Sequence, residues 1–154
     1  MSAMPTTGIS IRTATPEDLG TLAAWAAELL RQWDATATEA DARRVYERIL
    51  RSPDMGIILV AEHDGVLGGF VYAAYQWRAE YAGETMDLVE MFVAQSWRNK
   101  GVGRGLLDAL LAHARQRKVR RIACQVHPNN AAIERALESG GFDPERRTLW
   151  GILL

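Results

Sequence analysis

The residues best suited to chemistry lie in a glycine-rich stretch in the second half of the chain, Arg98-Asn99-Lys100-Gly101-Val102-Gly103-Arg104-Gly105. An apolar run ending in Met91-Phe92-Val93 precedes it, and leucines at helical spacing follow it. The first turn of a helix leaves N–H groups without internal partners, and glycine lets a ligand approach the backbone closely. Together with the helix dipole and three basic side chains, this pattern predicts a loop that binds phosphate or pyrophosphate.

Two common phosphate-binding motifs do not fit this stretch. A Walker loop needs Gly-Lys followed by Ser or Thr, and a dinucleotide fold needs a third glycine one place later and an acid near Gln125. The stretch instead resembles the signature of the GNAT superfamily of acetyl-CoA-dependent N-acetyltransferases: Arg or Gln, two residues, Gly, one residue, then Gly or Ala. Arg98, Gly101 and Gly103 occupy the three fixed positions. A plain glycine-containing helix start and a generic nucleotide-binding loop are the alternatives.

The resemblance implies acetyl-CoA as the cofactor. Loop amides would hold the pyrophosphate of coenzyme A, and the preceding strand would pair with its pantetheine amides. An Asn after the following strand often touches the cofactor in this family, although Asn130 could equally be the N-cap of the next helix. The expected cofactor-binding residues are Met91, Phe92, Val93, Arg98, Asn99, Lys100, Gly101, Val102, Gly103, Arg104 and Asn130.

Acetyl transfer to a primary amine needs a base that takes the proton of the amine, and Glu90 is the only acid inside the apolar strand before the loop. Apolar surroundings would raise its pKa, which suits this role. The alternative is that Glu90 faces a polar edge or pairs with an arginine. The resemblance also implies a backbone bulge near Val93, whose main-chain amide would meet the developing oxyanion.

The last helix departs from the family pattern. GNAT enzymes usually carry a tyrosine there that protonates the departing thiolate, but Leu137 occupies this position while Asn130 and Gly141-Phe142 stay in register. Coenzyme A thiolate can leave without full protonation, and hydroxyls of Ser139, Tyr72, Tyr75 or Tyr81 could substitute. The loss also leaves room for a non-catalytic protein that binds acyl-CoA and acts as a regulatory or interaction module.

The helices and strands that must position these residues can be predicted from the hydrophobic periodicity and from the turn and capping residues. We expect an α/β (α+β) fold with a mixed, mostly antiparallel sheet flanked by helices and splayed between the fourth and fifth strands, as in GNAT proteins. Asp64-Gly65 predicts a hairpin turn, and Gly68-Gly69 predicts a bulge or a close backbone approach. Expected strands cover residues 10–13, 55–62, 66–76, 88–93, 119–126 and 147–154; expected helices cover 15–31, 38–49, 103–117 and 131–139, with a connection over 77–84.

Composition limits the remaining function classes. The 154 residues carry 48% apolar and 24% charged residues with a net charge of −1, which fits one GNAT-like domain over residues 1–154 and argues against nucleic-acid binding. A single cysteine, Cys124, and the lack of a signal or membrane segment predict a cytoplasmic protein without metal. Trp25, Trp33 and Tyr46 could line the pocket of a small-molecule or peptide amine or belong to the core. The apolar C-terminal tail could support a homodimer.

Overall fold

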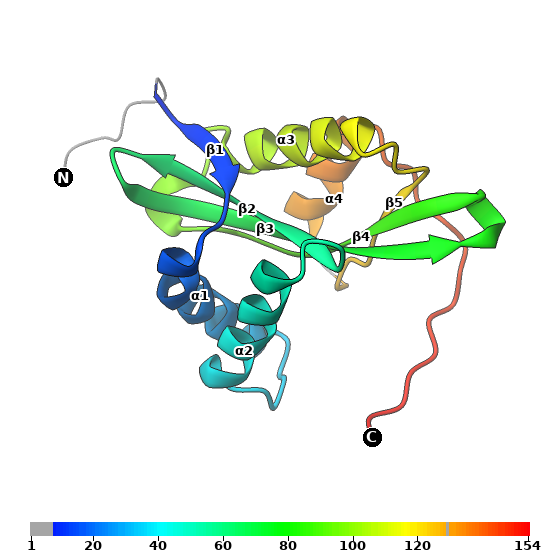
Figure 1. Cartoon of the computed structure of the whole chain (residues 1–154), viewed down its shortest axis with the longest axis horizontal. Helices are drawn as coiled ribbons and strands as arrows, with labels where there is room; N and C mark the ends of the chain where they lie inside the picture. Colours follow the sequence, from blue (N-terminus) through cyan, green and yellow to red (C-terminus); the bar gives the residue numbers. More distant parts are fainter. Residues whose placement is uncertain (1–7, 129) are drawn as a thin grey trace.

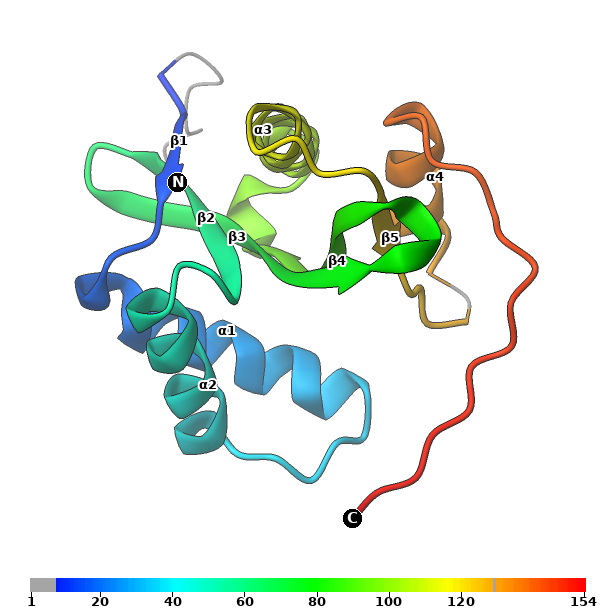
Figure 2. The ribbon, with the colours of Figure 1, turned by 45° about the vertical axis from the view of Figure 1, so that its right-hand side comes forward.

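The computed structural model describes residues 8–128 and 130–154, and it places a five-stranded sheet between two layers of helices (Figure 1). The strands follow the spatial order β1-β2-β3-β4-β5, and every neighbouring pair is antiparallel except β4 and β5. In Figure 2, α1 and α2 cover one face of the sheet, and α3 and α4 lie on the other. The elements are β1 (Ser10–Thr13), α1 (Leu19–Gln32), α2 (Glu39–Arg51), β2 (Gly56–His63), β3 (Val66–Arg78), β4 (Gly83–Val93), α3 (Val102–Gln116), β5 (Ile122–Cys124) and α4 (Ala131–Ser139).

Local sequence signals explain where the first two helices begin. Thr15 and Asp18 form a capping box around the short 3-10 turn η1 (Pro16–Asp18), which leads directly into α1. Thr38 and Asp41 form a second capping box at the start of α2, with the Thr38 amide donating to the Asp41 carboxylate at 2.8 Å. Such boxes satisfy N–H groups that the first helical turn leaves free. The expected helices over 15–31 and 38–49 are therefore confirmed to within a few residues.

The sheet has one hydrophobic cluster on each face. The cluster under α3 gathers mainly Leu106, Leu107, Leu110, Val71 and Met86, and the cluster under α1 and α2 gathers Leu22, Tyr46, Ile58, Val60 and Phe70. Strands β2 and β3 are buried on both faces, which accounts for their almost uninterrupted apolar sequences. The amphipathic helices cover both sides of this central ribbon and fix its position.

The β2–β3 hairpin turns where the sequence predicts, with positive φ at Asp64 and Gly65. Gly68 is the extra residue of a bulge, because Ala61 pairs with Gly69 and Glu62 pairs with Leu67. A Cβ atom at Gly68 would lie 2.1 Å from the Trp97 ring, so only glycine lets this indole pack over the strand. The expected bulge and close approach are both present.

The β3–β4 hairpin is longer than the sequence predicts. Residues 77–84 were expected to form a connection, but β3 continues to Arg78, the 3-10 turn η2 (Ala79–Tyr81) closes the hairpin, and β4 starts at Gly83. Ladder hydrogen bonds override the polar composition there, and Thr85 and Glu84 are buried despite their polarity. The hairpin forms the arm that projects from the body in Figure 1.

The sheet opens between β4 and β5, as expected. Their parallel pairing covers only Met86 to Leu88 opposite Ile122 to Cys124, while β4 continues to Val93. The opening starts at a bulge, because Tyr72 pairs with Glu90 but Ala73 pairs with Leu88, which leaves Val89 as the extra residue. The bulge expected near Val93 therefore lies four residues earlier, at the point where β4 loses its β5 partner.

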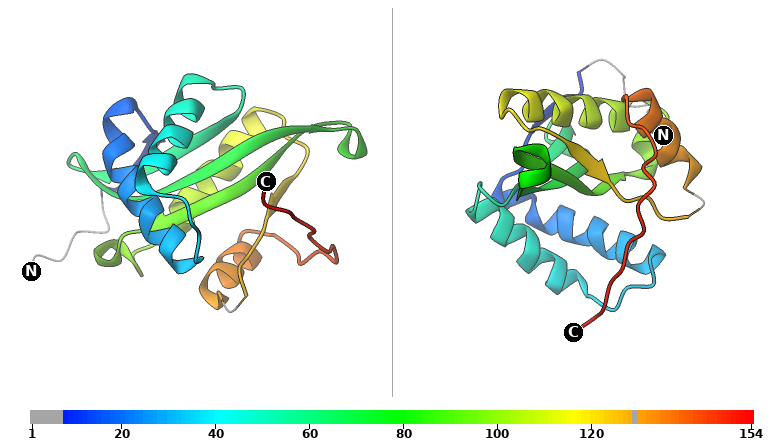
Figure 3. Two further views of the ribbon diagram at one scale, coloured as in Figure 1. Left: turned by 90° about the horizontal axis from the view of Figure 1, so that it is seen from below. Right: turned by 90° about the vertical axis from the view of Figure 1, so that its right-hand side faces the viewer.

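The C-terminal part of the sheet differs from the sequence prediction. Residues 119–126 were expected to form a strand, but β5 comprises only Ile122–Cys124. Residues 147–154 form no strand and run as an extended segment past β5 and α4 (Figure 3). Ion pairs Arg121–Glu145 and Arg147–Glu80 hold the start of this segment, and beyond it five large apolar side chains are at least 74% exposed. A strand needs a neighbour that supplies ladder hydrogen bonds, and the described residues offer none to this segment.

Candidate active site

The glycine-rich stretch forms an open helix N-terminus. Gly101 is the N-cap of α3 with φ +76°, and the first helical bond runs from the Gly105 amide to the Gly101 carbonyl at 2.9 Å. The N–H groups of Val102, Gly103 and Arg104 have no partner within the described part of the chain. A Cβ at Gly101 would meet no atom within 4 Å, so the space beside this residue is open. This geometry fits the anion that the sequence predicts.

The three basic side chains of the stretch brace the loop. Arg98 follows η3 (Gln95–Trp97), and its Nε donates to the Val93 carbonyl at 2.9 Å. Lys100 Nζ donates to the Ser96 carbonyl at 2.8 Å. Arg104 Nε donates to Asp108 at 2.8 Å, and its Nη1 donates to the Ser139 carbonyl at 2.9 Å. These bonds fix the path from β4 into α3 and keep the positive charges of Arg98 and Lys100 near its first turn, while Asp108 balances the charge of Arg104.

The last residues of β4 present their backbone to the opening. Met91 and Val93 pack into the cluster under α3, and Phe92 packs into the cluster under α1 and α2. No described strand pairs with the β5-facing edge of residues 89–93. An extended ligand with amide groups could pair with this edge as a strand does. Asn99, the remaining residue of the loop, has a positive φ of 59° that turns the chain toward Gly101.

Glu90 projects from β4 toward the α1 and α2 layer and accepts a hydrogen bond from the Tyr46 hydroxyl of α2. Burial raises the pKa of the Glu90 carboxyl, and the Tyr46 bond opposes this rise in part. The pKa of Tyr72, which lies opposite Glu90 in the β3–β4 ladder, is raised by burial and by the Glu90 charge. Glu90 therefore pairs with a tyrosine rather than with an arginine or a polar edge. Tyr46 belongs to the core and also contacts the candidate base.

Aromatic side chains enclose this carboxylate region. Trp25 stacks on Phe92 with ring centroids 5.3 Å apart, and Tyr46 meets Tyr72 edge-on at 6.0 Å. Trp33, just after α1, stacks on His127 beyond β5 at 4.9 Å. This last contact links α1 to the far side of the sheet opening. The stack of Trp33 on His127 could not be predicted from the sequence, because the two residues are 94 positions apart and neither belongs to a motif.

The other candidate residues take structural positions. Asn130 accepts the Ile133 amide at 3.4 Å as the N-cap of α4, so the N-cap alternative is observed and cofactor contact stays a prediction. Leu137 is buried in the cluster under α3. Of the substitute hydroxyls, Ser139 binds Arg104, Tyr75 bonds His113 Nε2 at 2.6 Å, and Tyr81 accepts from Arg147 at 3.1 Å. Among the four, only Tyr72 lies opposite Glu90.

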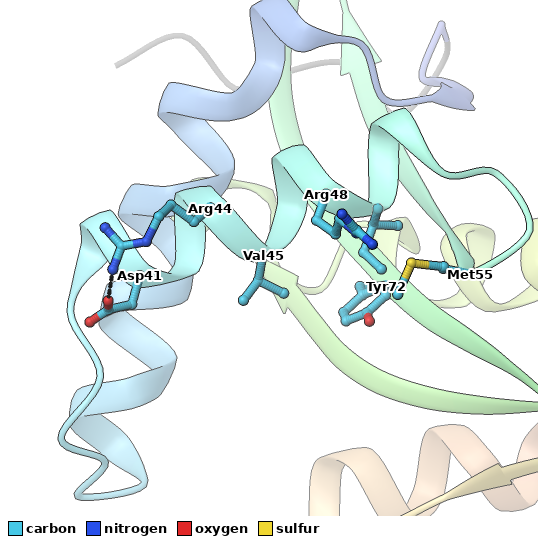
Figure 4. A pocket seen from close by; sticks show the side chains of 7 residues that line it. Asp41, Arg44, Val45, Arg48, Met55 and Tyr72 are labelled. Carbon is cyan, nitrogen blue, oxygen red and sulfur yellow. Dashed lines mark hydrogen bonds and ion pairs between the residues drawn. The ribbon is translucent and has the colours of Figure 1, made fainter.

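Two cavities adjoin these elements. One of about 440 Å³ lies between α2, Met55 and Tyr72 (Figure 4). The other, of about 960 Å³, lies between β5, α4 and the C-terminal segment, and Cys124 and Leu137 line it. Burial raises the pKa of Cys124 to about 11, which disfavours the thiolate that a nucleophile needs.

Among the residues described, no group of His, Cys, Asp or Glu side chains could hold a metal ion. No described helix has the length and apolar composition to cross a membrane.

Comparison with known proteins agrees with this geometry. The sequence profile described as "Acetyltransferase (GNAT) family" matches residues 21–142. The aminoglycoside N(6')-acetyltransferase type 1 of Stenotrophomonas maltophilia is 29% identical over 147 residues, which cover 92% of this chain and 90% of that protein.

Solved structures share the fold. A possible acetyltransferase from Clostridium difficile 630 superimposes with a TM-score of 0.84 at 16% identity, covering 95% of this chain and 97% of that chain. The aminoglycoside N-acetyltransferase AAC(6')-Iy in complex with CoA gives a TM-score of 0.79 at 21% identity, covering 94% of each chain.

The profile match spans α1 to the start of the C-terminal segment, including β4, the glycine-rich loop and α3. It confirms the family predicted from Arg98, Gly101 and Gly103, and with it the expected cofactor, acetyl-CoA. This chain belongs to the GNAT family of acetyltransferases.

Proposed function

We propose that this chain transfers the acetyl group of acetyl-CoA to a primary amine on a small molecule or peptide, by direct attack of the amine within a ternary complex. The observation that carries the proposal is the placement of two features by β4. The strand leads through η3 to the open amides of Val102–Arg104, and it carries the partly buried carboxylate of Glu90 beside the sheet opening. The proposed donor site and proton acceptor are thus both positioned by β4.

The cofactor residues divide into three groups. The N–H groups at the start of α3 would hold the pyrophosphate, with Arg98, Lys100 and Arg104 adding positive charge. The edge of Met91–Val93 would pair with the pantetheine amides. Asn130 would contact the cofactor from the start of α4. When bound, acetyl-CoA supplies an activated acyl carbon and a thiol leaving group.

Glu90 is the proposed base. An alkyl ammonium ion must lose a proton before it can attack, and a carboxylate whose pKa is raised accepts that proton more readily, directly or through water. The bond from Tyr46 fixes the orientation of the carboxylate. A main-chain amide on the unpaired edge of β4 would stabilise the developing oxyanion.

The leaving thiolate has no tyrosine at the usual position, since Leu137 is buried there. We propose that the thiolate departs without protonation by α4. The same observation supports the alternative, a module that binds acyl-CoA without turnover. The relation to the Stenotrophomonas maltophilia aminoglycoside enzyme supports catalysis and a small-molecule amine.

Two measurements on the purified protein separate these functions. Calorimetric titration with coenzyme A, with ATP and NAD as comparison ligands, tests the cofactor. A thiol-release assay over a panel of amines tests turnover. We expect coenzyme A to bind with micromolar affinity while ATP and NAD do not bind. We also expect thiol release that depends on the amine. Tight coenzyme A binding with no release on any amine would support the non-catalytic module, and stronger binding of ATP or NAD would refute the cofactor assignment.

We also propose a cytoplasmic homodimer. The single cysteine suits a reducing compartment, and the exposed apolar side chains of Leu149, Trp150, Ile152, Leu153 and Leu154 are an unusual concentration for a monomer. Sedimentation of the full chain and of a form ending at Thr148 tests the dimer. A full chain that sediments as a monomer at high micromolar concentration would refute it.

A further inference from the structure

The smaller cavity, which lies beside the candidate base, carries a net positive charge. This charge indicates which kind of amine acceptor could bind there. We propose that Arg48 of α2 recognises an anionic oxygen group, a carboxylate or a phosphate, on the amine acceptor. This inference deepens the proposed function and rests on it. The cavity measures about 440 Å³, within the range of small-molecule sites. Its lining residues are Asp41, Arg44, Val45, Arg48, Ile49, Met55 and Tyr72.

The charges of this cavity do not cancel. Asp41 accepts hydrogen bonds from the Thr38 amide and hydroxyl, and it forms an ion pair with Arg44. Figure 4 shows this pair at one end of the cavity and Arg48 near Tyr72 and Met55 at the other. Within the described residues, Arg48 has no ion-pair partner. Its guanidinium is therefore available for a ligand, and it offers several donors to a carboxylate or phosphate.

The cavity is connected to Glu90 through Tyr72. Tyr72 forms part of the cavity wall and pairs with Glu90 across the β3–β4 ladder. Tyr46, which donates to Glu90, lies on the buried side of α2, while Arg48, two residues later, lies on its exposed side, so the link from the cavity to Glu90 runs through Tyr72. An amine held at Glu90 would extend past Tyr72 to place an attached anionic group at Arg48.

The cavity does not supply a matching site for a cationic acceptor. Asp41 is the one acid among its lining residues, and Asp41 is paired with Arg44. A polycationic aminoglycoside would therefore meet the Arg48 guanidinium in this cavity rather than a free carboxylate, in contrast with the aminoglycoside substrate for which the Stenotrophomonas maltophilia relative is named.

A set of amines with similar chains tests the charge preference. We expect β-alanine and O-phosphoethanolamine to show kcat/KM values at least tenfold above those of propylamine and 1,3-diaminopropane. The two anionic amines also separate carboxylate from phosphate recognition. An equal or better rate with propylamine or 1,3-diaminopropane would overturn the inference while leaving the proposed function intact.

Matched variants locate the effect. Arg48→Gln should raise KM for the anionic amines on the order of tenfold and leave propylamine unchanged. Arg51→Gln is the control, because Arg51 lies on the same helix, pairs with Glu47 and does not line the cavity. An equal effect of both variants, or an effect of Arg48→Gln on propylamine, would overturn the role of Arg48.

Equilibrium binding provides a readout that needs no turnover. Calorimetric titration of β-alanine and propylamine into the protein saturated with coenzyme A should show tighter binding of β-alanine, and Arg48→Gln should remove the difference. Equal affinities would overturn the inference. Failure of the protein to bind coenzyme A at all would instead refute the proposed function on which the inference rests.

Discussion

Gly103→Asp should weaken coenzyme A binding without weakening the fold. Gly103 lies in the first turn of α3, and a Cβ there would meet its nearest atom, Val93 Cγ2, at 3.7 Å, an ordinary van der Waals distance. Aspartate is a better helix residue than glycine, and its charge is favourable near a helix N-terminus by about 0.3–1 kcal/mol. The free protein should therefore be as stable as the wild type or slightly more stable.

The loss of binding follows from the charge placed beside the pyrophosphate. Two unit charges 4 Å apart repel by about 1 kcal/mol even in bulk water, so one carboxylate against a doubly charged diphosphate costs about 2 kcal/mol. That corresponds to a dissociation constant roughly 30-fold higher, and the effect should shrink at high salt. Gly103→Ala separates the bulk of the side chain from its charge. Gly101→Asp is less informative, because Gly101 has φ +76° and the substitution also strains the loop.

The assay is calorimetric titration of coenzyme A at low and high salt, with thermal melting of the free protein. Ala112→Asp is the matched control, since Ala112 is an exposed residue of the same helix far from its N-terminus. Coenzyme A affinity that stays within twofold of the wild type in Gly103→Asp, or that falls equally in Ala112→Asp, would refute the assignment of the loop.

Three further predictions concern the base, the leaving group and the fold. Because burial raises the pKa of Glu90, folding favours its protonated form, and the contribution of this group to stability falls as pH rises above its unfolded-state pKa. Glu90→Gln should therefore abolish turnover, and the variant should melt at a higher temperature than the wild type at pH 7 but not at pH 4. A lower melting temperature of the variant at pH 7 would contradict this. The 960 Å³ cavity beside Leu137 has room for a tyrosine hydroxyl. Leu137→Tyr should therefore raise kcat several-fold over Leu137→Phe if protonation of the thiolate limits the rate. Equal kcat values for the two variants would show that this proton does not limit the rate. Gly68→Ala should cost about 1–3 kcal/mol of unfolding free energy by chemical denaturation, because its Cβ would overlap the Trp97 ring, whereas Gly65→Ala, with open space around it, reports only the cost of positive φ.

Local signals made much of the fold predictable. The capping boxes at Thr15 and Thr38, the Asp64-Gly65 turn and the strand-loop-helix unit around Gly101 depend on residues a few positions apart, and all of them are present in the structure. Strand formation in the C-terminal part of the chain was harder to predict, whereas β1 has the bounds that the sequence predicts. Residues 147–154 have the composition of a strand, but strand formation depends on a partner with free ladder groups, which composition does not reveal.

The site was predictable only in part. The loop residues are adjacent in the sequence, so their joint role could be inferred from spacing. The hydrogen bond between Tyr46 and Glu90 joins residues 44 positions apart, and the stack of Trp33 on His127 joins two loops. Such contacts arise from how α1 and α2 pack on the sheet. Nor does periodicity reveal that Arg48 stays unpaired while its neighbour Arg44 is neutralised.

The extra residue at Val89 has a consequence for how this site can change by mutation. Before it, Met86 and Leu88 face the α3 layer; after it, Met91 and Val93 do, while Glu90 and Phe92 face the opposite layer. The bulge thus resets the alternation of the strand by one step. Deleting Val89 itself would remove the bulge and place Glu90 directly after Leu88 in ordinary alternation, so Glu90 would still face α1 and α2 and Met91 would still face α3. Deletion of Val89 therefore separates two properties of β4, because the direction of Glu90 is kept while the irregular pairing that marks the start of the sheet opening is lost.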